Sequence, residues 1–507
     1  MRTKKALYNI VTQMSYEVVA MVCGLVLPRF ILSAFGSSYN GMVASITMFL
    51  DYISFLTLGI SGSVRVAIYN AKANGGIREL SAIVKTAENY MRKVAYAFIG
   101  YMVILAFVYP YIVRDEFRWL EVASLVVIIG IGTFAEYFFG ITCKTFLMAD
   151  QSMYINNVIQ IAFKIINTLV SIVLIKLGYS IHIVKLGSAV CFAFCPILLN
   201  YIVYRKYGIM KDVEPDPLAL KNRKDVMAHS IANCVLQYTP TFLLTMLTTP
   251  ATISVYAVYT LVLGSLSKVQ NVFTTGLEAA FGELWAKKET GSVEKNFDTF
   301  EFLIYSFASV VFPCAAILIL PFVRIYTSDI TDIEYILPVF ATLLVVDYAS
   351  DCLRTPYLII VQAAGRYKET KKAAYIEAAL SLCVSTVCVY KFGLVGVAIG
   401  SLTANCYRMI HYAVYISGRL LRRKFGKFVR RILWLTLNAL IIALLYRVLP
   451  SGEIENWFQW ILGGVYYCAM TFAVTLASAF VFYRSDLNHA MGVAGRMLAS
   501  KLRKSGK

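Results

Sequence analysis

Polar and ionisable side chains recur at helical spacing on three otherwise apolar stretches, and they carry most of the chemistry that the sequence offers. The first stretch runs from Asp51 through Phe55, Leu58 and Gly62 to Arg65. The second spaces Lys268, Asn271, Thr275 and Glu278 three or four residues apart, and the third sets Asp347, Asp351 and Arg354 on one helix face. An ionisable side chain at bilayer depth costs roughly 2.5–3.5 kcal/mol on insertion scales and usually faces a cavity. The stripes therefore predict a passage through a membrane protein.

Fixed cations in such a passage suit a phosphate-bearing substrate. Arginine holds phosphate oxygens with a planar fork and stays charged at any relevant pH. The candidate diphosphate-binding residues are Arg29, Arg65, Lys268 and Arg354. An alternative stays open for each of them, although Lys268 lies mid-span, where snorkelling to the interface is harder. Arg29 and Arg65 lie toward span ends, where a long side chain snorkels to the interface, and Arg354 has a neutralising carboxylate three residues earlier.

Deep carboxyl groups are candidates for coupling transport to a cation gradient or for charge pairing. They are Glu17, Asp51, Glu278, Asp347 and Asp351. Burial and a neighbouring like charge favour the protonated acid or a bound cation, so H⁺ and Na⁺ are both candidate partners. The alternative is that each acid is the counter-ion of a nearby base. Glu136, Lys164 and Arg408 are further intramembrane charges to which the sequence assigns no role.

Composition indicates a membrane protein throughout. Of 507 residues, 59% are hydrophobic and 15% are charged, whereas a soluble domain carries about 25% charged residues. Apolar runs close to the ~20 residues that cross a bilayer recur along the whole chain and predict about fourteen spans. They lie near residues 6–34, 40–69, 90–112, 119–143, 152–176, 180–204, 226–248, 251–283, 298–323, 333–362, 372–390, 393–418, 428–448 and 457–483.

The distribution of basic residues fixes the expected topology. With a cytoplasmic N-terminus, most of the 48 lysines and arginines fall in cytoplasmic loops and tails. Both termini are therefore expected in the cytoplasm of a bacterial inner-membrane protein. The net charge of +19 reflects this topology and contact with anionic membrane lipids, and no nucleic-acid partner is expected because no basic soluble domain exists.

Loop lengths divide the predicted spans into six, six and two. Residues 1–204 form an N-lobe, 205–225 an interlobe linker, and 226–418 a C-lobe. A basic loop at 419–427, the last two spans at 428–484 and a basic tail at 485–507 follow. Lys176-Leu177-Gly178 and Lys391-Phe392-Gly393 sit at matching turns of the two lobes, with Gly187-Ser188 and Gly400-Ser401 after them. Matching topology predicts a parallel pseudo-repeat.

The sequence lacks the residue patterns of metal sites, disulfide frameworks and enzyme active sites. The eleven cysteines are scattered and the four histidines form no cluster, so neither a metal site nor a disulfide framework is expected. No nucleophile–base set or phosphate-binding glycine loop appears, which argues against an enzyme and against a cofactor.

The six-plus-six-plus-two layout, the short loops, the pattern Leu58-Gly59-Ile60…Val64-Arg65…Ala67 and the turn Phe35-Gly36…Tyr39-Asn40 together resemble a known family. It is the polysaccharide transporter branch, or Wzx-type flippases, of the multidrug/oligosaccharidyl-lipid/polysaccharide flippase superfamily. The resemblance implies two lobes around a central cavity that opens alternately to either side. It implies a polyprenyl (undecaprenyl) diphosphate-linked oligosaccharide as the substrate, and polysaccharide polymerase machinery is a candidate partner.

Three other functions stay open at this point. A lipid-linked peptidoglycan precursor flippase shares the diphosphate and the lipid. A multidrug or cation antiporter shares the fold but calls for acids without matching arginines. A membrane glycan polymerase or ligase requires an acceptor site, usually on a long external loop, and the predicted external loops are short.

Overall fold

A computed structural model describes residues 2–57, 63–65, 67–69, 71, 76–210, 212–216, 224–274, 277–286, 290–421, 423–449 and 452–492. Several predicted positions lie outside the described residues: Leu58 and Gly62 of the first stripe, Gly59 and Ile60 of the family pattern, Thr275 of the second stripe, the side chain of Glu278, Lys211 and Pro217 of the linker, and the tail beyond residue 492. The described chain is built from helices, and it divides into two compact units.

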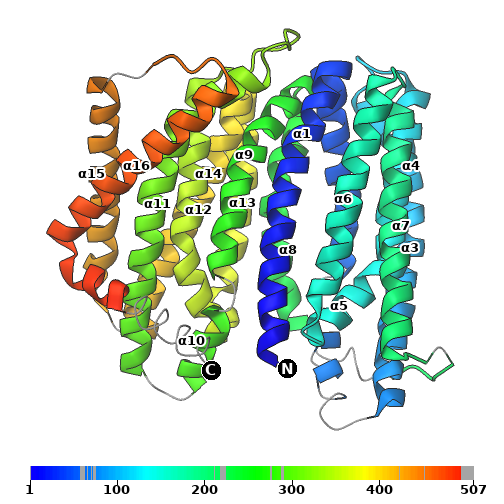
Figure 1. The fold of residues 1–507 in the computed structure, drawn as a ribbon, viewed down its shortest axis with the longest axis horizontal. Coiled ribbons are helices and arrows are strands. Elements are labelled where there is room, and N and C mark those ends of the chain that lie inside the picture. Colours follow the sequence, from blue (N-terminus) through cyan, green and yellow to red (C-terminus); the bar gives the residue numbers. More distant parts are fainter. Residues whose placement is uncertain are drawn as a thin grey trace. The chain divides into compact units, whose positions relative to one another are not determined.

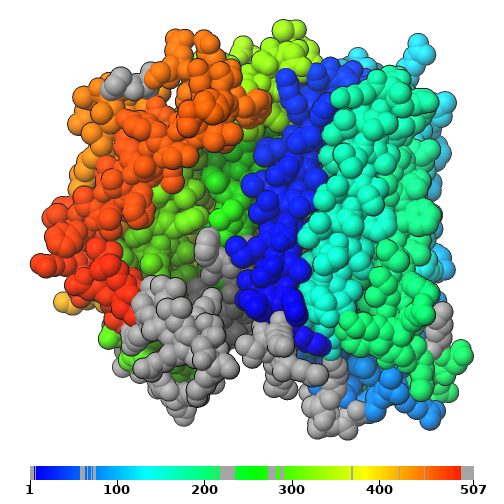
Figure 2. All heavy atoms as spheres, in the orientation of Figure 1, coloured from blue at the N-terminus to red at the C-terminus, as the bar shows by residue number. Residues whose placement is uncertain are grey.

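The first unit comprises residues 1–261 together with the short segment 329–333. Its helices are α1 (Arg2–Asp51), η1 (Tyr52–Thr57), α3 (Ile77–Ile112), α4 (Trp119–Ala135), η2 (Glu136–Gly140), α5 (Ile141–Ala149), α6 (Met153–Lys176), α7 (Ile181–Tyr207) and α8 (Lys224–Leu247), with the start of α9 (Pro250–Thr274). Helix α1 packs along α6, α6 along α7, and α7 along α4. Figure 1 shows these helices running side by side, and Figure 2 shows the side chains of α1 and α6 in contact along much of their length.

The second unit comprises residues 262–328 and 334–507. It contains the rest of α9, α10 (Leu277–Ala286), α11 (Thr290–Tyr326), α12 (Pro338–Ala363), α13 (Tyr367–Phe392), α14 (Leu394–Tyr415), η4 (Ile416–Leu420), α15 (Gly426–Val448) and α16 (Trp457–Phe482). Helices α13 and α14 form a close hairpin, α12 packs on α14, and α11 contacts α12, α15 and α16.

The prediction of an all-α polytopic membrane protein is confirmed. Among the described residues, ten helical stretches are long and apolar enough to cross a membrane. Most predicted spans coincide with a helix of the described residues. The span predicted at 40–69 instead covers the end of the helical stretch Arg2–Asp51, the short η1 and residues outside the described set. Large apolar side chains such as Ile104 (63% exposed), Val387 (64%) and Val465 (66%) stand on helix surfaces without a protein neighbour to cover them. Such surfaces are suited to a hydrocarbon environment.

The first two predicted spans are joined with almost no loop. The helical stretch Arg2–Asp51 is interrupted at Gly36, whose backbone (φ 82°, ψ 177°) is not helical. Positive φ favours glycine because it has no Cβ. The next residue, Ser37, donates from its backbone N–H and its hydroxyl to Asp332, at 2.7 and 2.6 Å. The turn predicted at Phe35-Gly36 is therefore a sharp break, and a carboxylate satisfies the freed N–H.

Candidate functional site

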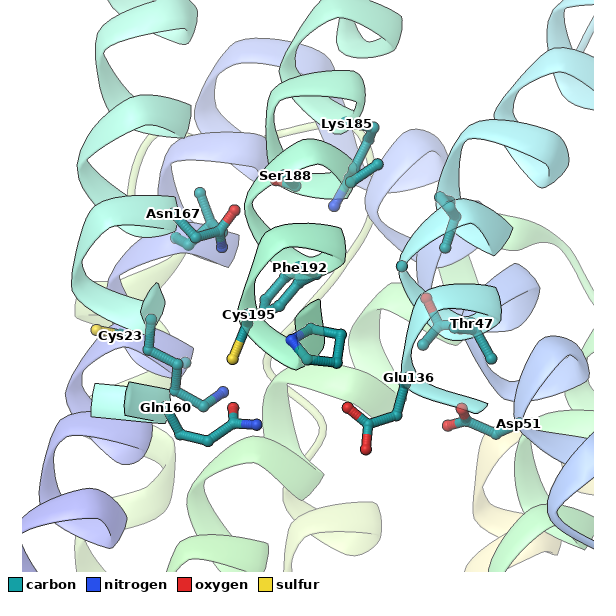
Figure 3. Close-up of a pocket in the computed structure, with 18 of the residues that line it drawn as sticks. Cys23, Thr47, Asp51, Glu136, Gln160, Asn167, Lys185, Ser188, Phe192 and Cys195 are labelled. Carbon is teal, nitrogen blue, oxygen red and sulfur yellow. The ribbon is translucent and has the colours of Figure 1, made fainter. Parts of the chain in front are cut away.

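The first unit contains a polar cavity of about 640 Å³ between its membrane-spanning helices. Helices α1, α4, α5, α6 and α7 and the short η2 line it. Its ionisable residues are Asp51, Glu136, Lys144, Lys164 and Lys185, and its polar residues include Thr47, Gln160, Asn167 and Ser188. Figure 3 shows Asp51, Glu136, Gln160 and Lys185 around one space, with Lys185 and the carboxylate of Glu136 directed into it.

Irregular helix geometry occurs at several points of the cavity wall. Pro28 of α1 and Pro196 of α7 both line the cavity, and a proline inside a helix removes one backbone hydrogen bond and bends the axis. Between α4 and α5 the chain forms a single π-helical turn at Glu136–Gly140. A Cβ on Gly140 would lie 2.7 Å from the Glu136 carboxylate. The glycine therefore leaves room for that carboxylate in the wall, and π-turns of this kind often occur at functional sites.

The cavity carries more cations than anions. Three lysines face two carboxylates, which leaves one positive charge in excess. Lys144 Nζ lies 2.7 Å from Glu136 Oε1, so these two charges compensate each other. Lys164 lies 6.0 Å from the ring centre of Tyr16.

Lys185 and Asp51 occupy the same cavity without a charged partner of their own. Within the described residues, neither side chain has an ion pair or a hydrogen bond. An unpaired charge in a low-dielectric interior is costly. A substrate group of opposite sign would reduce that cost, and an ammonium group at Lys185 is suited to a phosphate or carboxylate oxygen.

Two of the predicted basic residues lie elsewhere in the first unit. Arg29 forms an ion pair with Asp329, which also accepts a 2.6 Å hydrogen bond from the Ser33 hydroxyl. Burial raises the pKa of Asp329, but the hydrogen bonds from Ser33 and Arg29 outweigh it and hold that pKa below its ordinary value. Arg65 contacts the sulfur of Met148 at 3.1 Å. Neither arginine lines the cavity.

The predicted acid Glu17 belongs to a polar row that joins α1 to α6. Gln13 donates to Glu17 at 2.8 Å and accepts from Asn157 at 3.0 Å. This row lies outside the lining of the cavity. Of the acids predicted for the first unit, Asp51 is the one that lines it.

The predicted residues of α12 meet partners inside the second unit. Arg354 pairs with Asp351 and with Glu377 of α13, and Arg408 of α14 approaches Glu377 at 3.6 Å. Asp347 is buried and accepts a 2.7 Å hydrogen bond from Asn405. These contacts tie α12, α13 and α14 together. Two positive charges already balance the two carboxylates around Arg354, which agrees with the charge-pairing interpretation of that residue.

The second basic candidate of this unit, Lys268, has an exposed side chain on α9. No ion pair of Lys268 is found among the described residues. The side chain of Glu278 lies outside the described set.

Sequence reasoning missed Lys144, Lys185 and Glu377. Lys144 follows the predicted end of a span and Lys185 follows a helix start by four residues, so both resembled interfacial lysines. Glu377 is a single acid near the start of an apolar run. The available signal was the coincidence of Glu136, Lys164 and Lys185 on three successive spans, which the sequence alone does not place at one depth.

The second unit has a larger and mostly apolar groove of about 870 Å³. Helices α11, α12, α15 and α16 supply most of its lining, which includes Phe312, Leu320, Leu435 and Ile442. The groove also contacts Arg324 and Arg447, each in the last turn of its helix, and the carboxylate Glu453. An apolar trough of this kind is suited to a long hydrocarbon chain.

Comparisons with known proteins give matches at the level of structure. No family model and no curated protein sequence matches the chain. The solved structure of the lipid II flippase MurJ in an inward closed conformation aligns with a TM-score of 0.69 at 14% identity, covering 94% of this chain and 99% of that one. An inward-facing multidrug resistance MATE family transporter of the MOP superfamily gives 0.61 at 12% identity, covering 82% and 99%. The eukaryotic MATE transporter AtDTX14 gives 0.56 at 14%, covering 85% and 99%. The chain therefore has the fold of these transporters and flippases.

Proposed function

We propose that this chain is a flippase of the polysaccharide transporter branch. It moves polyprenyl-diphosphate-linked oligosaccharide units across the bacterial inner membrane, with both termini in the cytoplasm, for the synthesis of a surface polysaccharide. Two lobes open alternately to either side. The observation that carries the proposal is the cationic cavity among the helices of the first unit, with Lys185 lacking a carboxylate partner among the described residues. An anionic, sugar-bearing head group is the kind of cargo that such a cavity favours.

The apolar groove of the second unit supports the lipid part of the proposal. A polyprenyl chain stays in hydrocarbon while its head group crosses, so the carrier needs a polar path for the head and an apolar track for the tail. The groove lined by Phe312, Leu320 and Leu435 has the apolar character for part of such a track. The cavity of the first unit has the polar groups for the head.

A lipid-linked peptidoglycan precursor flippase is the second candidate, because the chain shares the fold of a lipid II flippase over almost its whole length. The two candidates carry the same diphosphate and differ in the sugar. A multidrug antiporter is less consistent with the cavity, because its ionisable residues leave one positive charge in excess, which repels cationic drugs. A glycan polymerase is less consistent with the short connections, such as the four residues between α6 and α7.

The carboxylates offer a way to couple the cycle to H⁺ or Na⁺. Asp51 lines the cavity and has no partner among the described residues, and we assign it the coupling role ahead of Glu17. Among the predicted diphosphate ligands, Arg29 and Arg354 already have carboxylate partners. We therefore expect the cavity lysines to contribute more to head-group binding than these arginines do.

The test is a flipping assay in proteoliposomes with a fluorescent polyprenyl-diphosphate oligosaccharide. A membrane-impermeant quencher reports the fraction that has crossed. We expect Lys185→Met to lower the rate about tenfold, the loss of roughly 1.4 kcal/mol of interaction, and Lys185→Arg to keep most of it. Lys176→Met is the matched control, because Lys176 is exposed at the end of α6.

The same assay separates the candidate functions. Transport of the oligosaccharide lipid but not of lipid II supports the proposal, and the reverse preference indicates the peptidoglycan flippase. Wild-type protein that moves neither lipid, and instead exports a cationic dye, contradicts both.

A further inference from the structure

A second basic site lies at one end of the two C-terminal helices, far in sequence from the cavity. It is a polar cavity of about 290 Å³ where α15 begins and α16 ends. Four cations line it, Lys427, Arg430, Arg431 and Arg484, against two carboxylates, Asp298 and Asp486. Its lining therefore carries two positive charges in excess.

The four cations differ in the ion pairs that they already form. Lys427 lies 2.7 Å from Asp298, and Arg431 lies 2.9 Å from the buried Glu301 and 3.2 Å from Asp486. Arg430 and Arg484 have no carboxylate partner among the described residues. Their charge is available to an external anion.

Aromatic rings and a carbonyl hold these two arginines in place. Arg430 donates to the backbone oxygen of Phe482 at 3.0 Å and lies 5.0 Å from the ring centre of Tyr483. Arg484 lies 5.0 Å from the ring centre of Phe480. Prior fixation of this kind lowers the entropy that binding an anion would cost.

The buried arginine of this cavity, Arg431, can also donate a further hydrogen bond. Arg431 is 3% exposed, and its Nη1 has no hydrogen-bond partner. A buried guanidinium nitrogen without an acceptor is costly. An anion in the cavity would add negative charge next to this arginine.

An apolar groove continues from the basic cavity along the same two helices. A second pocket of about 270 Å³ shares Arg430, Phe482 and Tyr483 with the cavity and adds Leu433, Trp434 and Leu437. Leu433 is 63% exposed on the face of a helix apolar enough to cross a membrane. The combined site is polar at the helix ends and apolar along the helices, as a membrane lipid is.

We propose that this site binds an anionic phospholipid, with its phosphate among Arg430, Arg484 and Lys427 and an acyl chain along Leu433 and Leu437. Basic pockets between membrane helices bind such head groups. The sequence beyond residue 492 adds five lysines and arginines and no acid, which increases the attraction for an anionic leaflet. A free phosphate would use the cavity alone, so the continuous groove favours the lipid.

The test is native mass spectrometry of the purified full-length protein with phosphatidylglycerol or phosphatidylcholine of identical acyl chains. We expect preferential retention of phosphatidylglycerol, and the Arg430→Gln/Arg484→Gln double variant is expected to weaken it at least about tenfold. Both arginines are exposed, so the variant should fold. The matched control is Lys371→Gln/Lys372→Gln, which removes two exposed charges from the first turns of α13.

Retention that falls in the Arg430/Arg484 variant and not in the control supports the site. Equal retention by all three proteins overturns it. Equal retention of the two lipids by the wild type also overturns it, because the phosphate specificity would then be absent. Displacement of the lipid by millimolar inorganic phosphate would show that the cavity takes a free anion, which contradicts the lipid assignment.

Discussion

Lys144 and Glu136 form a 2.7 Å ion pair on the wall of the polar cavity, although they lie eight positions apart in the sequence. A π-helical turn between them, with Gly140 against the carboxylate, brings the two charges together. The pair neutralises one of the three cavity lysines. Lys185 then remains as a cavity cation without an ion pair among the described residues, where a head group enters the proposed cycle.

A double-mutant cycle measures this pair. Glu136→Gln and Lys144→Met each leave a partly buried charge without its partner, and each should lower stability by about 1–3 kcal/mol. The double variant should recover part of that loss, because neither charge then remains. Thermal unfolding in detergent gives the comparison. Strictly additive losses would show that the two side chains are not coupled.

If Asp51 couples transport to a cation gradient, its removal should change how the flipping rate responds to that gradient more than it changes substrate binding. With Asp51→Asn and Glu17→Gln combined, we expect flipping driven by a pH or sodium gradient to fall to the rate without a gradient. The amides cannot exchange a proton or balance a cation. The gradient-dependent and gradient-free rates are compared in the same proteoliposomes. A full gradient response in the double amide variant would exclude both acids as the coupling groups.

The ion pair between Arg29 and Asp329 predicts a modest dependence of stability on pH. The pKa of Asp329 is lower in the folded chain than in the unfolded one. Its contribution is therefore present above the unfolded pKa and is lost as the pH falls through the folded pKa. Because the Asp329 side chain is 46% exposed, the effect should stay below about 1 kcal/mol. Asp329→Asn should be less stable than wild type at pH 7 and equal to it in strong acid, as followed by thermal unfolding.

Much of this architecture follows from local sequence. The turns at Lys176-Leu177-Gly178 and Lys391-Phe392-Gly393 occur as predicted, with positive φ at Gly178 (78°) and Gly393 (53°). Such turns need only a break in an apolar run and a glycine. The sequence equally predicted the long apolar helices, because they depend on the length of the apolar runs.

The ion-pair partners of the charged residues could not be predicted from local sequence. Asp329 meets Arg29 after 300 residues, and Glu377 meets Arg354 from another helix. Such pairs depend on tertiary packing, which leaves no periodic trace along the chain. The cavity lysines illustrate the same limit, since three separate helices contribute one each and none lies on a polar stripe.

Within the second unit, Glu301 of α11 anchors the start of α15, and its removal should have a large effect on stability. Its buried carboxylate accepts from Arg423 at 2.8 Å and from Arg431 at 2.9 Å, and the hydroxyl of Tyr357 donates to it. Glu301→Gln leaves two buried guanidinium groups without their shared anion, which should cost about 3–5 kcal/mol. Glu294→Gln, at a 40% exposed carboxylate 3.6 Å from Lys427, is the control and should change little. Similar thermal unfolding of the two variants would contradict this role.

The hairpins α6–α7 and α13–α14 each contain a Gly-Ser pair, at Gly187 and at Gly400. We expect the change from glycine to alanine to affect stability differently at the two positions. A Cβ on Gly400 would lie 1.9 Å from the Ser385 hydroxyl and 2.6 Å from the Ser385 backbone nitrogen, so Gly400→Ala forces α13 and α14 apart. A Cβ on Gly187 would meet the flexible end of Leu174 at 2.9 Å, which can move away. We therefore expect Gly400→Ala to destabilise the protein by about 1–3 kcal/mol, as overpacking does. Gly187→Ala should be close to neutral or slightly stabilising, because alanine favours the helix by roughly 1 kcal/mol over glycine. Thermal unfolding of both variants under one condition distinguishes them, and an equal loss would mean that the close approach at Gly400 is not required by the fold.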